Sequence, residues 1–276
     1  MTPNTPSGAG SGLRPPEVPA DVYTEEYYRN HCGPHETWNQ HNGRVIAGYY
    51  RGAVEKISLR PGEKLVDLGA GRGELLAAAI QAGAASAIGV EYSTAAVELA
   101  ETTLRAQGVT DAARMLHGDV RATELGGGQA DVVTLLDVVE HLTPDEVDQT
   151  LREAHRLLAP GGRVVIHTLP NRLVYDVTYR LQRLSRPTRI LHWPRNPRNA
   201  YELKMHINEH TLGSLRRSIK RAGLISVEVH RGAWILDHFV VEDRAKLLYR
   251  RLAAHRLTAP LGVADLWGYG YQADET

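Results

Sequence analysis

The stretch LVDLGAGRGEL, Leu65 to Leu75, decides which fold this chain adopts. Apolar and acidic residues typical of a buried strand run into Gly69, Gly71 and Gly73, and an apolar helical pattern follows them. This order predicts a strand, a tight turn and a helix N-terminus around a small ligand, because glycines let the backbone approach a ligand closely.

Strands and helices alternate on both sides of this turn. Short apolar runs bounded by turn residues predict strands in the segments 64–69, 86–93, 113–120, 130–142 and 163–171, with helical patterns between them. Alternation at this spacing predicts an α/β fold with a doubly wound, parallel sheet.

Three helix boundaries follow from the same patterns. A helical stripe of apolar residues begins at Val45 and ends before Pro61, ahead of the first strand. The fourth strand is expected to run directly into a helix at Asp137, and the helix after it is expected to continue to a stop at Gly161 and Gly162.

Composition divides the chain into five segments. We expect a Pro/Gly/Ser/Thr-rich disordered tail at 1–20, an N-terminal lid and first helix at 21–60, and a cofactor-binding core at 61–172. A basic insertion that caps the acceptor site is expected at 173–205, and the C-terminal part of the core at 206–276. The insertion holds six Arg and one Lys against one Asp and one Glu, a local charge of +5.

The overall composition excludes several classes of protein. Lys+Arg and Asp+Glu both total 32, so no global charge favours nucleic acid as a partner. The single cysteine, Cys32, rules out an internal disulfide and fits a reducing, cytoplasmic location. No apolar run approaches the roughly 20 residues of a membrane-spanning helix, so no transmembrane segment is expected.

The glycine turn favours an adenosine cofactor without a diphosphate. Glu91, at the end of the second strand, lies 22 residues beyond Gly69, where an acid can bind the hydroxyls of a ribose. A dinucleotide site needs Gly or Ala at the sixth position of the motif, and here that position is Glu74, whose charge would repel a diphosphate. S-adenosylmethionine (SAM) carries adenosine and a zwitterionic tail without phosphate.

Five motifs in order resemble those of the class I SAM-dependent methyltransferases: VDLGAGRGEL, GVEYS, HGDV, LLDVVEHL and LLAPGGRVVIHTLPN. The resemblance implies a Rossmann-like, mostly parallel seven-stranded sheet with N-terminal lid helices and an insertion after strand 5. It also implies that Glu91 binds the ribose, Asp119 the adenine amino group and Val120 the ring face, with Asp137 beside the reactive methyl group. The implied cofactor residues are Asp67, Gly69, Ala70, Gly71, Gly73, Glu91, Tyr92, Asp119, Val120 and Asp137.

The motif D-x-x-E-H at Asp137, Glu140 and His141 is the main candidate for catalysis, since these positions share one helix face if a helix begins there. It resembles the E-x-x-E-H of the ubiquinone-pathway O-methyltransferases and of the bacterial small-RNA 2′-O-methyltransferases, which also place a histidine after the fifth strand. We expect His141, His206 and Asp137 to be catalytic. A divalent metal on Glu140, His141 and His206 is the less favoured alternative, because Asp137 shortens the reach of the first acid.

Acceptor contacts are expected from the lid and from the insertion. Polar aromatic residues precede the core and would line the lid. Arginines with interleaved aromatic residues fill the insertion, and this pattern is equally compatible with binding of an anionic acceptor, docking on a membrane surface or a solvated face. The expected acceptor residues are Tyr28, His31, His35, Trp38, His41, Arg172, Tyr175, Tyr179 and His210.

The sequence therefore favours a methyltransferase that acts on a small biosynthetic metabolite, most simply by O-methylation with a histidine as base. Carbon methylation of an anionic or isoprenoid diphosphate acceptor is the second possibility. Metal-assisted 2′-O-methylation of RNA is third, because HTLPN replaces the TTPN of that group. A SAM-binding protein without catalysis is the fourth. The acceptor and the oligomeric state stay open.

Overall fold

A seven-stranded sheet forms the centre of the computed structural model, which describes residues 13–185, 191–232 and 243–274. The strand order is β3-β2-β1-β4-β5-β7-β6, and β7 runs antiparallel to both of its neighbours. The parallel, doubly wound sheet predicted from the sequence is confirmed. The strands are β1 (Lys64–Leu68), β2 (Ser86–Glu91), β3 (Ala113–His117), β4 (Ala130–Leu136), β5 (Leu158–Thr168), β6 (Ile225–Arg231) and β7 (Leu266–Tyr271).

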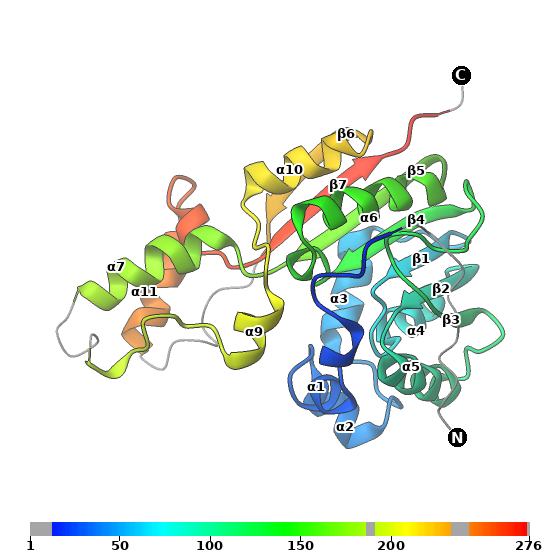
Figure 1. Cartoon of the computed structure of the whole chain (residues 1–276), viewed down its shortest axis with the longest axis horizontal. Helices are drawn as coiled ribbons and strands as arrows, with labels where there is room; N and C mark the ends of the chain where they lie inside the picture. The colour runs from blue at the N-terminus through cyan, green and yellow to red at the C-terminus, as the bar shows by residue number, and fades with distance from the viewer. Residues whose placement is uncertain (1–12, 186–190, 233–242, 275–276) are drawn as a thin grey trace.

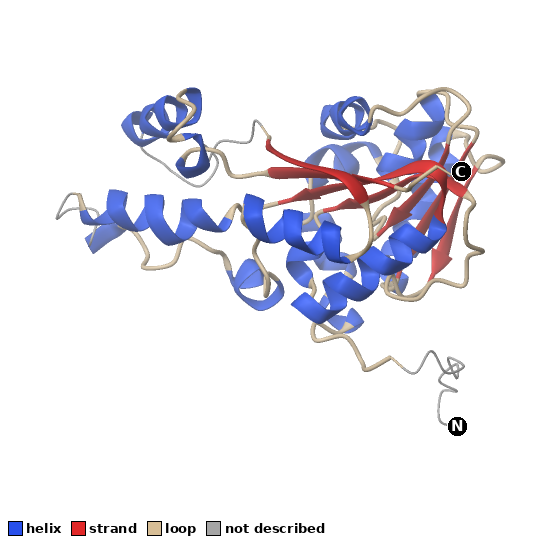
Figure 2. Ribbon diagram, turned by 90° about the horizontal axis from the view of Figure 1, so that it is seen from above, coloured by secondary structure: helices blue, strands red, loops and turns tan. Residues whose placement is uncertain are grey.

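Helices cover both faces of the sheet (Figure 2). On one face, α6 (Pro144–Leu157) and α10 (Leu212–Arg221) pack against one apolar cluster. On the other face, α3 (Gly48–Ile57), α4 (Glu74–Gln81) and α5 (Thr94–Gln107) contribute to a second cluster. Strand residues alternate between the two clusters, as Val132 and Val133 do, because successive side chains of a strand point to opposite faces.

Two of the predicted helix boundaries are wrong. The first helix begins at Gly48, and Val45 lies before it with 41% of its surface exposed. The helix α6 ends at Leu157, so Gly161 and Gly162 belong to the start of β5 rather than to a helix stop. Pairing of Leu158 with Ala130 of β4 explains this, since it continues the sheet into that segment.

The N-terminal segment folds onto the core. It contains η1 (Ala20–Val22), α1 (Glu25–Asn30) and α2 (His35–His41). The backbone N–H of Glu17 donates to Glu146, the hydroxyl of Tyr92 donates to the carbonyl of Val18, and Val18 itself is buried. The prediction of a disordered tail through residue 20 is therefore wrong for residues 17–20, and residues 1–12 lie outside the described part.

The insertion after β5 leaves the sheet and returns (Figure 1). A π-helical turn, η3 (Val174–Tyr179), continues into α7 (Arg180–Leu184), which projects beyond the sheet at the same end of the molecule as α11 (Asp243–Ala254). The chain then comes back through α9 (Ala200–Met205), near α1. A short turn, η5 (Ala259–Leu261), precedes β7. None of the helices in the described ranges is long and apolar enough to cross a membrane.

Substitution of Gly89 tests the packing between β2 and the glycine turn. A Cβ at Gly89 would lie 2.6 Å from the sulfur of Met115 and 2.7 Å from the Cβ of Ala70. We expect Gly89→Ala to lower the free energy of unfolding by about 1–3 kcal/mol, because the extra methyl group overpacks the interior.

The matched control is Gly52→Ala in α3, where a Cβ meets nothing within 4 Å. This substitution is expected to raise the free energy of unfolding by about 0.5–1 kcal/mol, since Ala favours a helix interior over Gly. Urea denaturation of both variants measures the difference, and equal effects would contradict this packing of β2.

Candidate functional site

The site is built where the chain order reverses in the sheet, because β1 lies between β2 and β4 and all three end at the same edge. The turn after β1 lies directly against the residue that follows Asp137. A Cβ on Gly69 would come within 2.5 Å of Cγ2 of Val138, and Gly69 has a φ of 84°. Only glycine meets both demands, so the turn brings bare backbone to the end of β4.

Glu91 is fixed at the end of β2 by three backbone N–H groups. Its Oε1 accepts from Tyr92 and Ser93, and its Oε2 accepts from Gly71 at 3.1 Å. Burial raises the pKa of this carboxyl. Glu91 therefore links the glycine turn to β2, and among the described residues its Oε2 accepts from Gly71 alone, which leaves a lone pair for a hydroxyl donor.

Asp67 lies beneath the turn and accepts a hydrogen bond of 2.6 Å from the hydroxyl of Thr134 on β4. Burial raises the pKa of Asp67 to about 7. Asp119 lies beyond β3, where the guanidinium of Arg121 donates to both of its carboxylate oxygens, and the same guanidinium donates to Glu146. The expected cofactor acids thus lie at the carboxyl edge, each oriented by a hydrogen bond or an ion pair.

Arg72, inside the glycine turn, was not predicted to have a role. Its guanidinium forms a fully buried ion pair with Glu74 at 2.8 Å. It also donates to the carbonyl oxygens of Tyr28 and Cys32 at the end of α1. Arg72 therefore connects the N-terminal helices to the turn by hydrogen bonds. It also neutralises Glu74, the acid that was expected to repel a diphosphate.

The D-x-x-E-H motif does not begin a continuous helix. Asp137 has a φ of 57°, a left-handed conformation, and only the short turn η2 (Val139–His141) separates it from α6. The expected shared helix face of Asp137, Glu140 and His141 is therefore wrong. Asp137 turns instead toward β5 and its carboxylate contacts His167 at 2.6 Å.

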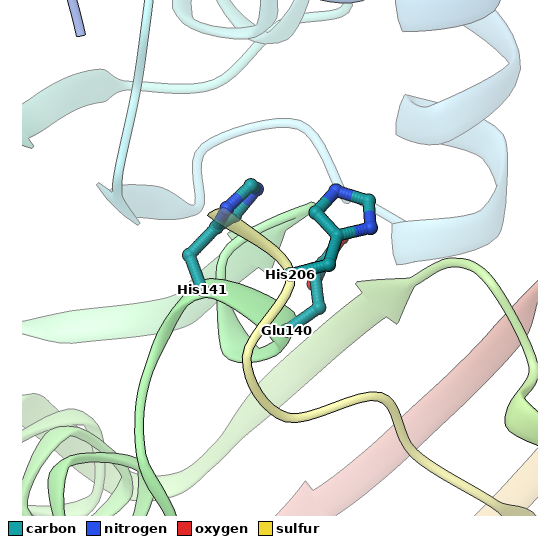
Figure 3. A group of neighbouring side chains, drawn as sticks. All are labelled: Glu140, His141 and His206. Atoms are coloured by element: carbon teal, nitrogen blue, oxygen red, sulfur yellow. The ribbon is translucent and has the colours of Figure 1, made fainter. Parts of the chain in front are cut away.

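Glu140, His141 and His206 come together although the last lies in a different segment (Figure 3). One ligand-type atom from each lies within 4.8 Å of the others, and the two imidazole rings lie 4.8 Å apart between centroids. The Nδ1 of His141 lies 3.2 Å from the carbonyl of Met205, which leaves its Nε2 available. The juxtaposition predicted from the sequence is present.

The electrostatics of this cluster favour neutral imidazoles. Burial lowers the pKa of His141 to about 4, and burial with the neighbouring ring lowers that of His206 to about 3. Burial and the charge of Asp137 raise the pKa of Glu140 to about 8. Two neutral imidazoles can accept a proton or ligate a cation, and the buried Nδ1 of His206 has no hydrogen-bond partner within the described ranges.

His167, on β5, is a site residue that the sequence reasoning missed. Its ring lies between the carboxylates of Asp137 at 2.6 Å and Asp265 at 3.3 Å. The hydroxyl of Tyr49 donates to the other oxygen of Asp137 at 2.9 Å. The signal was present in HTLPN, where a histidine ends a buried apolar strand, but its partners are far away in the sequence.

The expected acceptor residues fall into three groups. Tyr28 lies over the glycine turn, with its Cε1 3.7 Å from a Cβ placed on Gly71, and His31 stacks on Tyr201 of α9. Trp38 has a packing role in place of the expected acceptor contact, because it is buried and its indole N–H donates to Thr103 of α5. The others lie on α2, in the insertion or next to it in the chain: His35, His41, Arg172, Tyr175, Tyr179 and His210.

Most of the expected acceptor residues in and next to the insertion contact other residues of the protein. Tyr175 and Tyr179 are buried, and the guanidinium of Arg198 lies over the ring of Tyr175. Arg172 pairs with Asp176, and His210 is buried. A cavity of about 370 Å³ opens beside His206 and is lined by Arg172, Asp176, Asn196, Arg198, Leu203, His206, Ile207, Asn208 and Glu209.

Comparison with known proteins agrees with this geometry. A family described as a methyltransferase domain matches residues 65–162. A ubiquinone biosynthesis O-methyltransferase of Pseudomonas fluorescens (strain SBW25) is 30% identical over 170 residues, which cover 62% of this chain and 67% of that protein. The protein of the same name from Pseudomonas aeruginosa (strain LESB58) is 36% identical over 133 residues, 46% of this chain and 56% of that protein. The chain thus spans little more than half the length of the Pseudomonas aeruginosa relatives that it matches.

A solved structure shows the same fold. Phosphoethanolamine N-methyltransferase 2 of Haemonchus contortus, in complex with S-adenosyl-L-methionine, matches with a TM-score of 0.59 at 18% identity. The match covers 92% of this chain and 57% of that chain.

These sequence matches define a class I SAM-dependent methyltransferase, and the chain belongs to this family. The order of its sheet agrees with this. SAM is the cofactor of the family. The relatives that match this chain include proteins named ubiquinone biosynthesis O-methyltransferase, a name that states the activity of those relatives.

Substitution of Gly69 tests the crevice. Gly69→Ala places a methyl group against Val138 and forces Ala to a φ of 84°, so we expect the dissociation constant for SAM to rise at least about tenfold. Isothermal titration calorimetry measures it. Gly108→Ala is the control, because Gly108 also has a positive φ of 66° but nothing lies within 4 Å of its Cβ. Unchanged binding by Gly69→Ala would contradict this cofactor site.

Proposed function

We propose that the protein transfers the methyl group of SAM to a hydroxyl oxygen of a small biosynthetic metabolite, with a histidine as the proton acceptor. The observation that carries the proposal is the placement of His141, in the turn η2 that follows Asp137, close to His206, which comes from the end of α9. A neutral imidazole beside the methyl group can take the hydroxyl proton during the attack, which assists O-methylation.

The cofactor contacts belong to the same proposal. The backbone of residues 69–73 and Asp67 would hold the amino-acid part of SAM, and Glu91 would accept from the ribose hydroxyls. Asp119, Val120 and Tyr92 would surround the adenine. The open lone-pair position on Glu91 supports this orientation, as do the bare backbone at Gly69 and the contact of Val138 with the turn.

The reaction is a direct displacement. The acceptor oxygen forms a bond to the methyl carbon while the bond from carbon to sulfur breaks, and the hydroxyl proton passes to an imidazole nitrogen. Holding the acceptor in line supplies much of the rate enhancement. The low pKa of both histidines keeps their rings unprotonated near neutral pH, so the receiving nitrogen is ready before the acceptor binds.

Turnover with labelled SAM tests the proposal. Incubation of the protein with methyl-labelled SAM and fractionated metabolites is expected to give a labelled product, and His141→Ala or His206→Ala is expected to lower kcat about 10²–10⁴-fold for the residue that accepts the proton. His230→Ala, at an exposed position on β6, is the control. Full activity in both site variants would remove the assignment of a histidine base.

A metal-assisted reaction is the second candidate, and the cluster of three ligand-type residues favours it. The residues fit a divalent cation, since one carboxylate and two neutral imidazoles converge and the Nδ1 of His206 lacks a partner among the described residues. A cation there would polarise the acceptor oxygen as a Lewis acid. Glu140, His141 and His206 would hold it, while Asp137 is engaged by His167.

Removal of divalent cations separates the two candidates. If the reaction uses a histidine base alone, kcat is expected to stay unchanged after treatment with EDTA and dialysis. Loss of activity that Mn²⁺, Mg²⁺ or Zn²⁺ restores would instead establish the metal-assisted reaction. Glu140→Gln should then weaken the affinity for the restoring cation.

Carbon methylation and RNA methylation have less support from the charges of the protein. Carbon methylation of an anionic acceptor would use the arginines beside the 370 Å³ cavity, but Arg172 is paired with Asp176 and Arg198 with Glu209. RNA methylation is less favoured because the protein has no net positive charge to attract phosphates: its basic and acidic residues are equal in number. Tight SAM binding without turnover on any metabolite fraction would instead indicate a SAM-binding protein without catalysis.

A further inference from the structure

An imidazole is held between two carboxylates at the end of β5. The Nδ1 of His167 lies 2.6 Å from Oδ1 of Asp137, and its Nε2 lies 3.3 Å from Oδ2 of Asp265. The indole N–H of Trp267 donates to the same oxygen of Asp265 at 3.1 Å. The ring of His167 is buried and cannot turn away to solvent.

The backbone adds a second connection between His167 and Asp137. The N–H of Asp137 donates to the carbonyl of His167 at 3.0 Å, next to the pairing of Leu136 with His167 in the sheet. His167 thus binds both the main chain and the carboxylate of a residue with a φ of 57°. A left-handed conformation is unfavourable for a residue other than glycine, and the surrounding contacts must maintain it.

The charges on this group are determined by their neighbours. Burial alone favours the neutral ring, but Asp137 and Asp265 outweigh it and raise the pKa of His167 to about 10. Burial alone would raise the pKa of Asp137, but His167 and the hydroxyl of Tyr49 hold it below its ordinary value. Glu140 and His141 also face Asp137. Asp137 and His167 therefore form an ion pair at the end of β4, in which the imidazolium favours the ionised form of the carboxylate.

We propose that His167 is a positioning residue that holds the ionised carboxylate of Asp137 toward the methyl end of the crevice, and that this carboxylate makes the site prefer the cationic sulfonium of SAM to the uncharged sulfide of the product. The inference rests on the proposed function. It adds the means by which the site distinguishes substrate from product.

The physical basis is a difference of one unit charge. SAM and the product S-adenosylhomocysteine share the adenosine and the amino-acid tail, so Glu91 and the glycine turn contribute equally to binding of both. Only the sulfonium interacts with a nearby carboxylate as an opposite charge, and such an interaction is strong in a partly dehydrated crevice. Loss of the fixed charge therefore weakens SAM binding selectively.

Calorimetric binding of both molecules tests the proposal. His167→Gln removes the imidazolium that keeps Asp137 ionised, so burial raises the pKa of Asp137 and favours its uncharged, protonated form. With that negative charge lost, we expect the dissociation constant for SAM to rise about tenfold relative to that for S-adenosylhomocysteine. Asp137→Asn is expected to give the same shift, because it removes the negative charge directly. His230→Gln, at an exposed position on β6, should leave the ratio of the two constants unchanged.

The outcome for each protein either supports or overturns the proposal. A selective loss of SAM binding in His167→Gln supports the proposal, whereas an equal loss for both molecules, or no loss, overturns it. If His167→Gln fails to fold, Asp265→Asn removes only the distant partner, and we expect the same selective shift in a smaller amount; an unchanged ratio in the folded variant overturns the proposal. Wild-type protein that binds neither molecule would refute the proposed function itself.

Discussion

The contact between Gly69 and Val138 is the constraint on which the rest of the site depends. It brings the turn after β1 against the end of β4, two segments that are far apart in the chain and adjacent in the sheet. Glycine is required because the turn combines a positive φ with a close approach. With this contact in place, Asp137 lies next to the glycine turn, and η2 follows with Glu140 and His141.

Buried ion pairs then orient the groups around the crevice. Arg72 and Glu74 are both buried, and so are His167 and Asp265. Such pairs add little net stability, because removing two charges from water costs about as much as their attraction returns. Their main effect is on geometry, since each charge has one low-energy position. The charged side chains of the site are thus held in more definite positions than apolar packing alone would give them.

The sequence predicted the parts of the site that local patterns encode. The glycine turn, Glu91 and Asp119 follow strands directly, and strand ends can be recognised from short apolar runs. The carboxylates that hold His167 could not be predicted, because they lie 30 and 98 residues away in the chain, and the backbone partners of Arg72 lie 44 and 40 residues away. Asp137 was misplaced on a helix because nothing local indicates a positive φ. Residue spacing also gives no information on the compartment or the oligomeric state, so the cytoplasmic location stays a prediction.

The segment around Val18 and Tyr23 has a practical consequence. The carbonyl oxygens of these two residues accept from Tyr92 and Ser93, which directly follow the ribose-binding candidate Glu91. The N-terminal segment is therefore hydrogen-bonded to the two residues that follow Glu91. Deletion of the chain up to Tyr23 would leave the hydroxyl groups of Tyr92 and Ser93, beside Glu91, without these two acceptors.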